Sequence, residues 1–410
     1  MLLLASRVSR AGGLASLRVG VVGRRRAQGA ALVGGVALMA SKEDTAACSP
    51  GQKCRVASYN VLSSKLCEPG YFVKCAKENL DPPTRLKRVQ ALLEQETKKK
   101  AVVCLQEVSR EWSGDLHAFF AKRGYQFTTG LYGNPFNGYM GVAVAWPQDK
   151  YELINVDCAR LSDDVQEARK KWERPVEVTG IRKFASNLKK RVGNALTALT
   201  SSLEYERPPF DGWKEARKKH NVLVTATLKP KHGEAFCVGT YHMPCLFGSV
   251  HKERVMVIHA ALAARRVQQV AAGKPYVLCG DFNVKPYDAC YQMLTQGSLS
   301  GEFNDYNPTK PEGDVVANTF AATVTPPLES AYVLANGKEP DFTNFAYTKN
   351  MGADMDAFVE TLDYVFLGPG WRVNGVLETV PAGAIDRSKP YPTLEQPSDH
   401  CMIAADLERE

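Results

Sequence analysis

An Asp and an Asn lie two residues apart directly after an apolar run at residues 276–279. Gly280 follows this run, and in extended backbone Asp281 and Asn283 project from the same face. An Asp that orients or deprotonates a water molecule, beside an Asn that donates to a phosphoryl oxygen, is suited to hydrolysis of a phosphate ester. A turn closed by the Asp side chain is the alternative interpretation of this motif.

Three other apolar runs also end in a polar side chain, namely Asn60, Glu107 and His242. A fourth element, Ser398-Asp399-His400, places an acid and an imidazole side by side just before the last apolar run. Layered α/β folds gather their sites at strand ends. We therefore expect these side chains to form one active site together with Asp281 and Asn283.

The chain alternates short apolar runs with helical patterns, which predicts a layered α/β fold. Helices are predicted at residues 84–100 and 254–270, where apolar residues recur at helical spacing. The predicted strands are residues 55–59, 101–106, 140–146, 151–156, 222–228, 235–241, 276–279, 362–367 and 402–407.

A polar, helical stretch at about 157–220 interrupts this alternation and is interpreted as an insertion. It carries 15 Lys or Arg against 10 Asp or Glu, and an apolar stripe at helical spacing runs from residue 181 to 199. Lys189, Lys190 and Arg191 have no acid nearby in sequence. These cations form either the solvated face of a packed helix or a contact for an anionic substrate or membrane surface.

The composition is that of a soluble globular protein, with 44% hydrophobic and 23% charged residues among 410. This excludes a disordered chain, a collagen and a multi-span membrane protein. Residues 1–42 hold seven Lys or Arg and no acid, which accounts for +7 of the formal charge of +8 and leaves the remainder at about +1. The eleven cysteines include no Cys-x-x-Cys pair, so we expect reduced thiols rather than a disulfide or zinc framework.

Residues 1–45 form a basic leader rich in Arg, Ala, Gly, Leu and Ser, which is typical of a transit peptide for a mitochondrion or plastid. The alternatives are a secretory or membrane-anchoring signal, with an apolar segment at residues 30–40, and a plain tail. The apolar segment is shorter than the roughly 20 residues of a comfortable membrane span. Residues 50–410 are predicted to form a single catalytic domain.

The order and strand context of these motifs resemble the endonuclease/exonuclease/phosphatase superfamily of metal-dependent phosphodiesterases. The resemblance spans nearly all of residues 54–406 and rests on five segments. It implies an α/β four-layer sandwich of two packed mixed β-sheets flanked by helices. The segments are Ser58-Tyr59-Asn60, Leu105-Gln106-Glu107-Val108, Gly280-Asp281-Phe282-Asn283, Leu362-Asp363-Tyr364 and Ser398-Asp399-His400.

The resemblance also implies a role for each site residue. Glu107 would bind Mg²⁺, for which Mn²⁺ can substitute, with help from Asn60 and Asp399. Asp281 would activate the attacking water, and Asn283 would steady that water or the phosphate. His400 and His242 would donate to phosphate oxygens, and Asp363 would orient the His400 ring.

Two further segments point to branches within the superfamily. Residues 341–345 resemble a loop of the carbon catabolite repressor-type deadenylases and nocturnin, which implies base contacts from Phe342, Asn344 and Phe345. The alternative is that this loop anchors its aromatic side chains in the core. Tyr139 resembles a phosphate-contacting Tyr of apurinic endonucleases, and its alternative is a structural role in a turn.

The sequence therefore favours a Mg²⁺-dependent phosphodiesterase that acts on single-stranded RNA or another nucleic acid, with a deadenylase-like 3′ to 5′ exoribonuclease activity. One alternative is a phosphodiesterase or phosphatase of the same fold that acts on a lipid headgroup, with the basic insertion on an anionic membrane. A second alternative is a catalytically silent binding protein. The joint presence of so many costly polar side chains argues against the silent protein.

Overall fold

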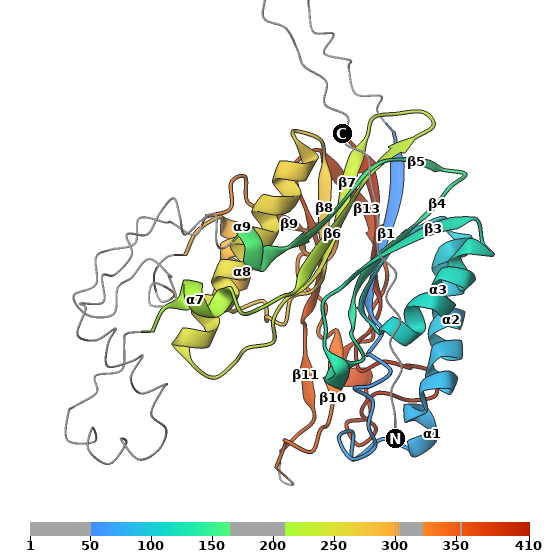
Figure 1. Cartoon of the computed structure of the whole chain (residues 1–410), viewed down its shortest axis with the longest axis vertical. Helices are drawn as coiled ribbons and strands as arrows, with labels where there is room; N and C mark the ends of the chain where they lie inside the picture. The colour runs from blue at the N-terminus through green and yellow to red at the C-terminus, as the bar shows by residue number, and fades with distance from the viewer. Residues whose placement is uncertain (1–50, 165–209, 300, 302, 304–322, 353–354) are drawn as a thin grey trace, which may run out of the picture. The chain divides into compact units, whose positions relative to one another are not determined.

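Two six-stranded β-sheets pack face to face in the centre of the protein (Figure 1). The computed structural model describes residues 51–164, 210–299, 301, 303, 323–352 and 355–410. The first sheet has the order β13-β14-β1-β2-β4-β3, and the second has the order β5-β6-β7-β8-β12-β9. Both sheets are mixed, because β1 runs parallel to β2 and β7 runs parallel to β8, whereas their other neighbours are antiparallel.

The strands are mostly short. The first sheet contains β1 (Lys53–Asn60), β2 (Val102–Val108), β3 (Tyr125–Leu131), β4 (Gly141–Pro147), β13 (Trp371–Val376) and β14 (Ile403–Arg409). The second contains β5 (Tyr151–Arg160), β6 (Val222–Pro230), β7 (Phe236–His242), β8 (Tyr276–Asp281), β9 (Glu329–Ser330) and β12 (Asp363–Leu367). A separate two-stranded sheet pairs β10 (Asn344–Ala346) with β11 (Phe358–Glu360).

Alternate residues of each strand fill different cores, as the two-residue period of a strand requires. Val56 and Val102 of the first sheet meet Val224 and Val277 of the second in the core between the sheets. The residues next in sequence, such as Ala57, point away from that core. Both faces of each sheet are therefore buried, which explains why the central strands read as nearly continuous apolar runs.

Helices cover the outer face of each sheet (Figure 1). The first sheet packs against α2 (Pro82–Lys98) and α3 (Arg110–Ala121), and the second packs against α7 (Gly212–Ala216), α8 (Val250–Ala271) and α9 (Ala289–Gln296). These layers confirm the predicted four-layer α/β sandwich. The short elements α1 (Lys77–Leu80), η1 (Pro135–Asn137), α10 (Ala331–Asn336) and η4 (Ala382–Ala384) lie in connections.

The predicted start of the insertion, at about residue 157, lies too early in the chain. β5 continues to Arg160, which pairs with Val222 of β6, so residues 157–160 belong to the second sheet. Only residues 161–221 separate the two paired strands, and α7 within them packs on α8. The apolar stripe of residues 181–199 and the basic residues Lys189, Lys190 and Arg191 lie outside the described residues.

The ten cysteines in the described part of the chain are all free. Six of them, including Cys104 and Cys279, are buried. Within the described ranges, no helix has both the length and the apolar character needed to cross a membrane.

Candidate active site

The predicted polar side chains meet at one end of the two facing sheets. Asp281 ends β8, where it pairs with His242 across the parallel β7–β8 ladder and with Asp363 across the antiparallel β8–β12 ladder. On the first sheet, Asn60 ends β1 beside the stretch of β2 that carries Glu107. The site is therefore built across the contact between the sheets, because each sheet contributes strand ends to it.

The Asn60 amide joins the two halves of the site. Its Nδ2 donates to Asp281 Oδ2 at 2.9 Å and to Glu107 Oε1 at 3.2 Å. Its Oδ1 accepts from the Leu62 backbone N–H at 3.0 Å, and the Ser63 N–H donates to Glu107 Oε2 at 3.0 Å. The turn after β1 thus holds Glu107 and Asp281 as hydrogen-bond acceptors.

Two imidazoles approach Asp281 from either side. His242 Nε2 lies 3.5 Å from Asp281 Oδ2, and His400 Nε2 lies 3.6 Å from the same oxygen. Both separations exceed a normal hydrogen bond. The Asn283 N–H donates to the other oxygen, Asp281 Oδ1, at 2.9 Å. Asp281 is 1% exposed, so these groups hold a carboxylate that is almost completely removed from solvent.

Asp363 binds His400 as the resemblance predicts. Its Oδ2 lies 2.7 Å from His400 Nδ1, and the Thr343 hydroxyl donates to the same oxygen at 2.6 Å. Burial raises the pKa of Asp363 to about 6, against the opposing effect of His400. Burial also acts to lower the pKa of His400, but Asp363, Asp281 and Asp399 together raise it well above its ordinary value. At neutral pH the pair is therefore a carboxylate and an imidazolium.

The site gathers more negative charge than its side chains balance. Burial raises the pKa of Asp399, and the neighbouring Glu107 carboxylate raises it further. Glu107, His242 and Asp281 have potential ligand atoms within 4.8 Å of one another. Carboxylate and amide oxygens are the preferred ligands of hard divalent cations. Glu107, which the resemblance names as a metal ligand, therefore lies in a group that could hold a divalent metal ion, whereas Asn60 turns its Nδ2 toward the carboxylates and its Oδ1 toward the Leu62 N–H.

Two site residues have left-handed backbone conformations that non-glycine residues rarely adopt. Glu107 has φ = 58° and lies where the β2–β4 register shifts, so a bulge turns its side chain toward the site. Asn283 has φ = 51°, and its Nδ2 donates to the Met243 carbonyl at 3.1 Å. Strain of this kind persists where the surrounding structure fixes a functional side chain.

A sequence profile of the Endonuclease/Exonuclease/phosphatase family matches residues 57–400, which include all the site residues named above. The chain belongs to this family. Family members are hydrolases that act on phosphodiester bonds.

The chain is similar in sequence to several exoribonuclease subunits and nocturnins. Ccr4, the 3′-5′-exoribonuclease subunit of the CCR4-Not complex of Emericella nidulans, is 24% identical over 402 residues, which cover 89% of this chain and 53% of that protein. Human nocturnin is 22% identical over 370 residues, which cover 86% of this chain and 64% of nocturnin. The chain spans less than two thirds of the length of these curated relatives, and the match to nocturnin of Drosophila melanogaster covers 28% of that protein.

The structure of ANGEL2 in complex with adenosine-2′,3′-vanadate, described as a 2′,3′-cyclic phosphatase, has the same fold as this family member. It superposes with a TM-score of 0.61 at 17% sequence identity, and the match covers 88% of this chain and 97% of that chain.

The predicted base-binding loop does not present its aromatic rings. Phe342 and Phe345 are 0% and 1% exposed, and both pack on Tyr391 in a small core. Asn344 is also buried, and its backbone pairs with His400. The expectation that Phe342 and Phe345 stack on a base is therefore wrong for this structure. Their rings instead stabilise the loop that carries Thr343, whose hydroxyl supports the Asp363–His400 pair.

Tyr139 lies in the loop between β3 and β4, at the border of the site. It is 37% exposed, has φ = 54°, and its ring lies 4.4 Å from the Arg110 guanidinium. Ser63, which binds Glu107, also donates from its hydroxyl to the Asn137 carbonyl of this loop at 2.8 Å. The loop is thus attached to the Glu107 side of the site, which is compatible with either predicted role of Tyr139.

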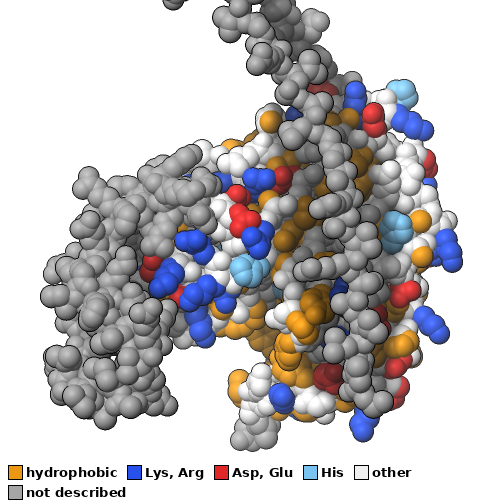
Figure 2. All heavy atoms as spheres, in the orientation of Figure 1, with side chains coloured by type: hydrophobic (Ala, Val, Ile, Leu, Met, Phe, Trp, Pro, Cys, Tyr) orange, Lys and Arg blue, Asp and Glu red, His pale blue; other side chains and the backbone are white. Residues whose placement is uncertain are grey.

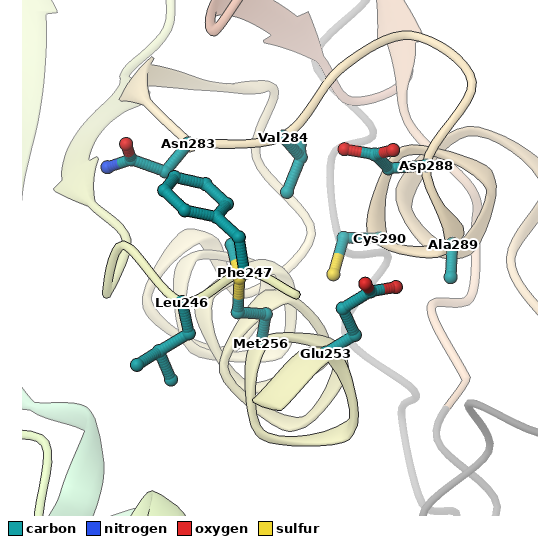
Figure 3. Close-up of a pocket in the computed structure, with 9 residues that line it drawn as sticks. All are labelled: Leu246, Phe247, Glu253, Met256, Asn283, Val284, Asp288, Ala289 and Cys290. Carbon is teal, nitrogen blue, oxygen red and sulfur yellow. The ribbon is translucent and has the colours of Figure 1, made fainter. Parts of the chain in front are cut away.

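A small cavity of about 30 Å³ adjoins Asn283 on the side facing α8 (Figure 3). Phe247 and Met256 line it from one side, and Val284 and Cys290 line it from the other (Figure 3). Its volume accommodates about two water molecules. The cavity is therefore too small to receive a nucleotide base.

Sequence reasoning missed the residues that hold the site residues in place. Arg85 is completely buried, and its guanidinium donates to the Val61, Leu62 and Pro397 carbonyls at 2.6 to 2.8 Å. It thereby joins the turn after Asn60 to the segment before Asp399. Tyr132 and Thr343 support His242 and Asp363 in a similar way. No spacing in the sequence distinguishes these residues from ordinary core and loop residues.

Proposed function

We propose that this protein is a Mg²⁺-dependent phosphodiesterase that degrades single-stranded RNA from its 3′ end, in the manner of a deadenylase. The observation that carries the proposal is the Asp281 carboxylate, which lies between the Nε2 atoms of His242 and His400 and is held by Asn60. The 3′-5′-exoribonuclease named among the relatives supports the choice of nucleic acid and of polarity.

In this proposal Asp281 orients a water molecule and accepts its proton as the water attacks phosphorus. Both imidazole Nε2 atoms lie farther from the carboxylate than a normal hydrogen bond, at 3.5 and 3.6 Å, so it keeps acceptor capacity for that water. Asn283 lies at the same strand end and contacts the water or the phosphate through its carboxamide. Asn60 fixes the orientation of the Asp281 carboxylate.

His400 and Asp363 act together on the phosphate. The Asp363 carboxylate holds Nδ1 of His400 at 2.7 Å, so the imidazolium directs its other N–H toward the centre of the site. There it donates to a non-bridging oxygen, whose negative charge increases during attack. A divalent metal held by Glu107, Asn60 and Asp399 would supply further neutralisation of that charge.

Basic side chains on the segment that leads into β6 suit a substrate with several phosphates. Lys214, Arg217 and Lys218 on and after α7 are exposed, and Figure 2 shows Lys and Arg side chains gathered on this part of the surface. The chain then enters β6, whose Leu223 pairs with Tyr241 next to His242. Cations placed at this end of the sheet favour a polyanion such as RNA.

The proposal is tested with the full chain, Mg²⁺ and a 5′-labelled single-stranded RNA that ends in adenosines. We expect a product ladder that shortens from the 3′ end and disappears with EDTA. Asp281→Asn should lower the rate by at least about a thousandfold, because it removes the proton acceptor with little change in shape. Asp149→Asn, at an exposed aspartate that pairs with Lys100, is the matched control and should keep full activity.

Parallel reactions with the same DNA sequence, with RNA ending in a 2′,3′-cyclic phosphate and with a phosphoinositide headgroup separate the alternatives. Preferred cleavage of the headgroup would replace RNA by a lipid substrate. Absence of Asp281-dependent hydrolysis of every substrate would support the catalytically silent protein instead. Full activity of Asp281→Asn would contradict the assigned chemistry.

We further propose that residues 1–45 direct import into a mitochondrion or plastid. Their seven basic residues and their lack of acids before Glu43 support this assignment. A fluorescent protein fused after residue 45 should enter the organelle, and replacement of the six arginines by glutamine should abolish entry. Delivery of the unaltered fusion to the secretory pathway would favour the signal-peptide alternative.

A further inference from the structure

The His242 ring is supported by a phenol on the side away from the reaction centre. Tyr132 Oη lies 2.9 Å from His242 Nδ1, while His242 Nε2 faces Asp281. The two rings meet edge to face, with their planes at 65°. Tyr132 follows β3 of the first sheet and His242 ends β7 of the second, so this contact also joins the two sheets.

The group that faces Nε2 determines the direction of that hydrogen bond. His242 Nε2 lies 3.5 Å from Asp281 Oδ2, and a carboxylate oxygen only accepts. A hydrogen on Nε2 leaves Nδ1 as an acceptor, so the Tyr132 phenol donates to it. Asn221 fixes the backbone that carries the ring, because its Nδ2 donates to the His242 carbonyl at 2.7 Å.

The same arrangement occurs a second time in the fold, away from the site. Tyr241 Oη lies 2.9 Å from His259 Nδ1, and His259 Nε2 lies 3.0 Å from the Ala216 carbonyl. A carbonyl only accepts, so Nε2 of His259 carries the hydrogen and Nδ1 accepts from the phenol. Burial lowers the pKa of His259 to about 4, which keeps this ring neutral.

We propose that Tyr132 is a positioning residue that holds His242 in the tautomer with its hydrogen on Nε2. That N–H then points toward Asp281 and the phosphate, where it donates to a phosphoryl oxygen. The role toward phosphate rests on the proposed function, whereas the tautomer is a property of the free enzyme.

The two histidines of the site then differ in the partner behind the ring. Asp363 holds Nδ1 of His400 with a carboxylate, which only accepts, whereas Tyr132 holds Nδ1 of His242 with a phenol, which can donate. Both rings therefore direct Nε2 toward the centre of the site, although the partners behind the two rings differ.

The tautomer is measured by ¹H–¹⁵N multiple-bond correlation spectra of the full chain with ¹⁵N-labelled histidine. The chain has seven histidines, and His242→Gln assigns the His242 ring by loss of its signals. We expect a protonated Nε2 and an unprotonated Nδ1 in the wild type. In Tyr132→Phe the His242 signals should move toward a mixture of tautomers. Tyr241→Phe, the matched control, should change the His259 signals and leave those of His242 in place.

Activity is measured in parallel with Mg²⁺ and the diester bis(4-nitrophenyl) phosphate. Tyr132→Phe should lower kcat about tenfold, which corresponds to the loss of one positioning hydrogen bond. Tyr241→Phe should leave kcat unchanged.

A wild-type His242 ring protonated on Nδ1 would overturn the proposal, and so would a Tyr132→Phe variant that keeps both the wild-type tautomer and the wild-type kcat. The wild-type spectrum decides the tautomer even where a variant fails to fold. Absence of diester hydrolysis by the wild type would count against the proposed function only, because the spectrum needs no substrate.

Discussion

Asp281 is a buried carboxylate whose polar neighbours restrain it without neutralising it completely. Asn60 and the Asn283 backbone donate to it, while two imidazoles remain 3.5 and 3.6 Å away. Burial of an incompletely paired charge costs stability. Such a residue is retained for chemistry, so substitutions here should reduce turnover far more than the free energy of unfolding.

Glu107→Gln should weaken metal binding without preventing folding. The amide keeps an acceptor for the Ser63 N–H but loses the negative charge that a divalent cation needs. We expect the Mg²⁺ concentration for half-maximal rate to rise at least about tenfold. The increase in Tm that saturating Mg²⁺ produces should shrink in the same variant.

Glu152→Gln, at an exposed glutamate on β5, is the control and should leave both quantities unchanged. An unaltered Mg²⁺ titration of Glu107→Gln would remove Glu107 from the metal site.

The sequence predicts the residues that perform the chemistry better than those that support them. Asn60, Glu107, Asp281 and His400 each end an apolar run or follow a short motif, and the fold brings strand ends together. Arg85 gives no comparable signal, because its function depends on three carbonyls that are distant in sequence. The aromatic loop misled the prediction, since an aromatic residue in a loop has the same sequence pattern whether it faces a base or the core.

At the scale of elements, Arg85 of α2 fixes two segments that converge on the site. It is fully buried, its guanidinium donates to three backbone carbonyls, and the same group lies 5.1 Å from the Trp112 ring. Arg85→Met fills much of the same volume but leaves those carbonyls without their donor. We expect the free energy of unfolding to fall by about 3 kcal/mol, measured by urea denaturation.

Arg88→Met is the matched control on the same helix. Arg88 is half-buried, and its Nη1 donates to Asn79 Oδ1 at 2.8 Å and to the Thr393 carbonyl at 3.3 Å. Its loss should cost about 1 kcal/mol. Equal effects of the two substitutions would contradict the special role of Arg85.

Gly280 allows β7 and β8 to approach at the base of the site. It has φ = 144°, and a Cβ at this position would lie 1.9 Å from the Tyr241 carbonyl oxygen. Gly280→Ala should therefore destabilise the protein by about 3 kcal/mol or more, because both backbone strain and a clash with backbone result. Thermal unfolding followed by circular dichroism measures the loss.

Gly114→Ala is the control, and we expect it to stabilise the protein rather than destabilise it. Gly114 lies on an exposed part of α3, where an added Cβ would have no neighbour within 4 Å. Alanine should raise stability there by about 0.5–1 kcal/mol. A tolerated Gly280→Ala would show that β7 and β8 can separate without loss of the fold.

The sequence predicts to within a few residues the helices and strands whose apolar residues recur regularly. It does not predict strands in which apolar residues show no regular spacing. α2 and α8 have regular apolar spacing, and β1, β6 and β12 are buried on both faces. In contrast, β3 has the sequence YQFTTGL and is mostly exposed or half-buried, because it lies at the edge of the first sheet. Its single buried face leaves no continuous apolar run. The start of the insertion was misplaced for the same reason, since the second half of β5 is polar and exposed.

At the scale of the whole molecule, the excess positive charge is concentrated in residues 1–42, and the remainder is nearly neutral. In the proposed function, steering of RNA must therefore depend on local clusters. Neutralising Lys189, Lys190 and Arg191 to glutamine should reduce the slope of log affinity against log salt by about 0.7 for each phosphate that these cations neutralise in the wild type. Binding of a fluorescent single-stranded RNA at several salt concentrations measures this slope.

The control replaces the basic run Lys98, Lys99 and Lys100, which ends α2 and precedes β2 at the end of the sheet opposite Glu107. These substitutions should leave the slope unchanged. An equal slope in the wild type and in the variant at 189–191 would contradict a phosphate contact. It would support the alternative interpretation, in which these residues form the solvated face of a helix.

The pairing of β1 with β14 also bears on when this protein becomes active. Asn60 ends β1, whereas Asp399 and His400 lie immediately before β14, so the site needs strands from both ends of the described fold. A ribosome delivers β14 long after β1. The site is therefore incomplete until the last strand has been synthesised, and the growing chain cannot carry out the chemistry of the finished protein.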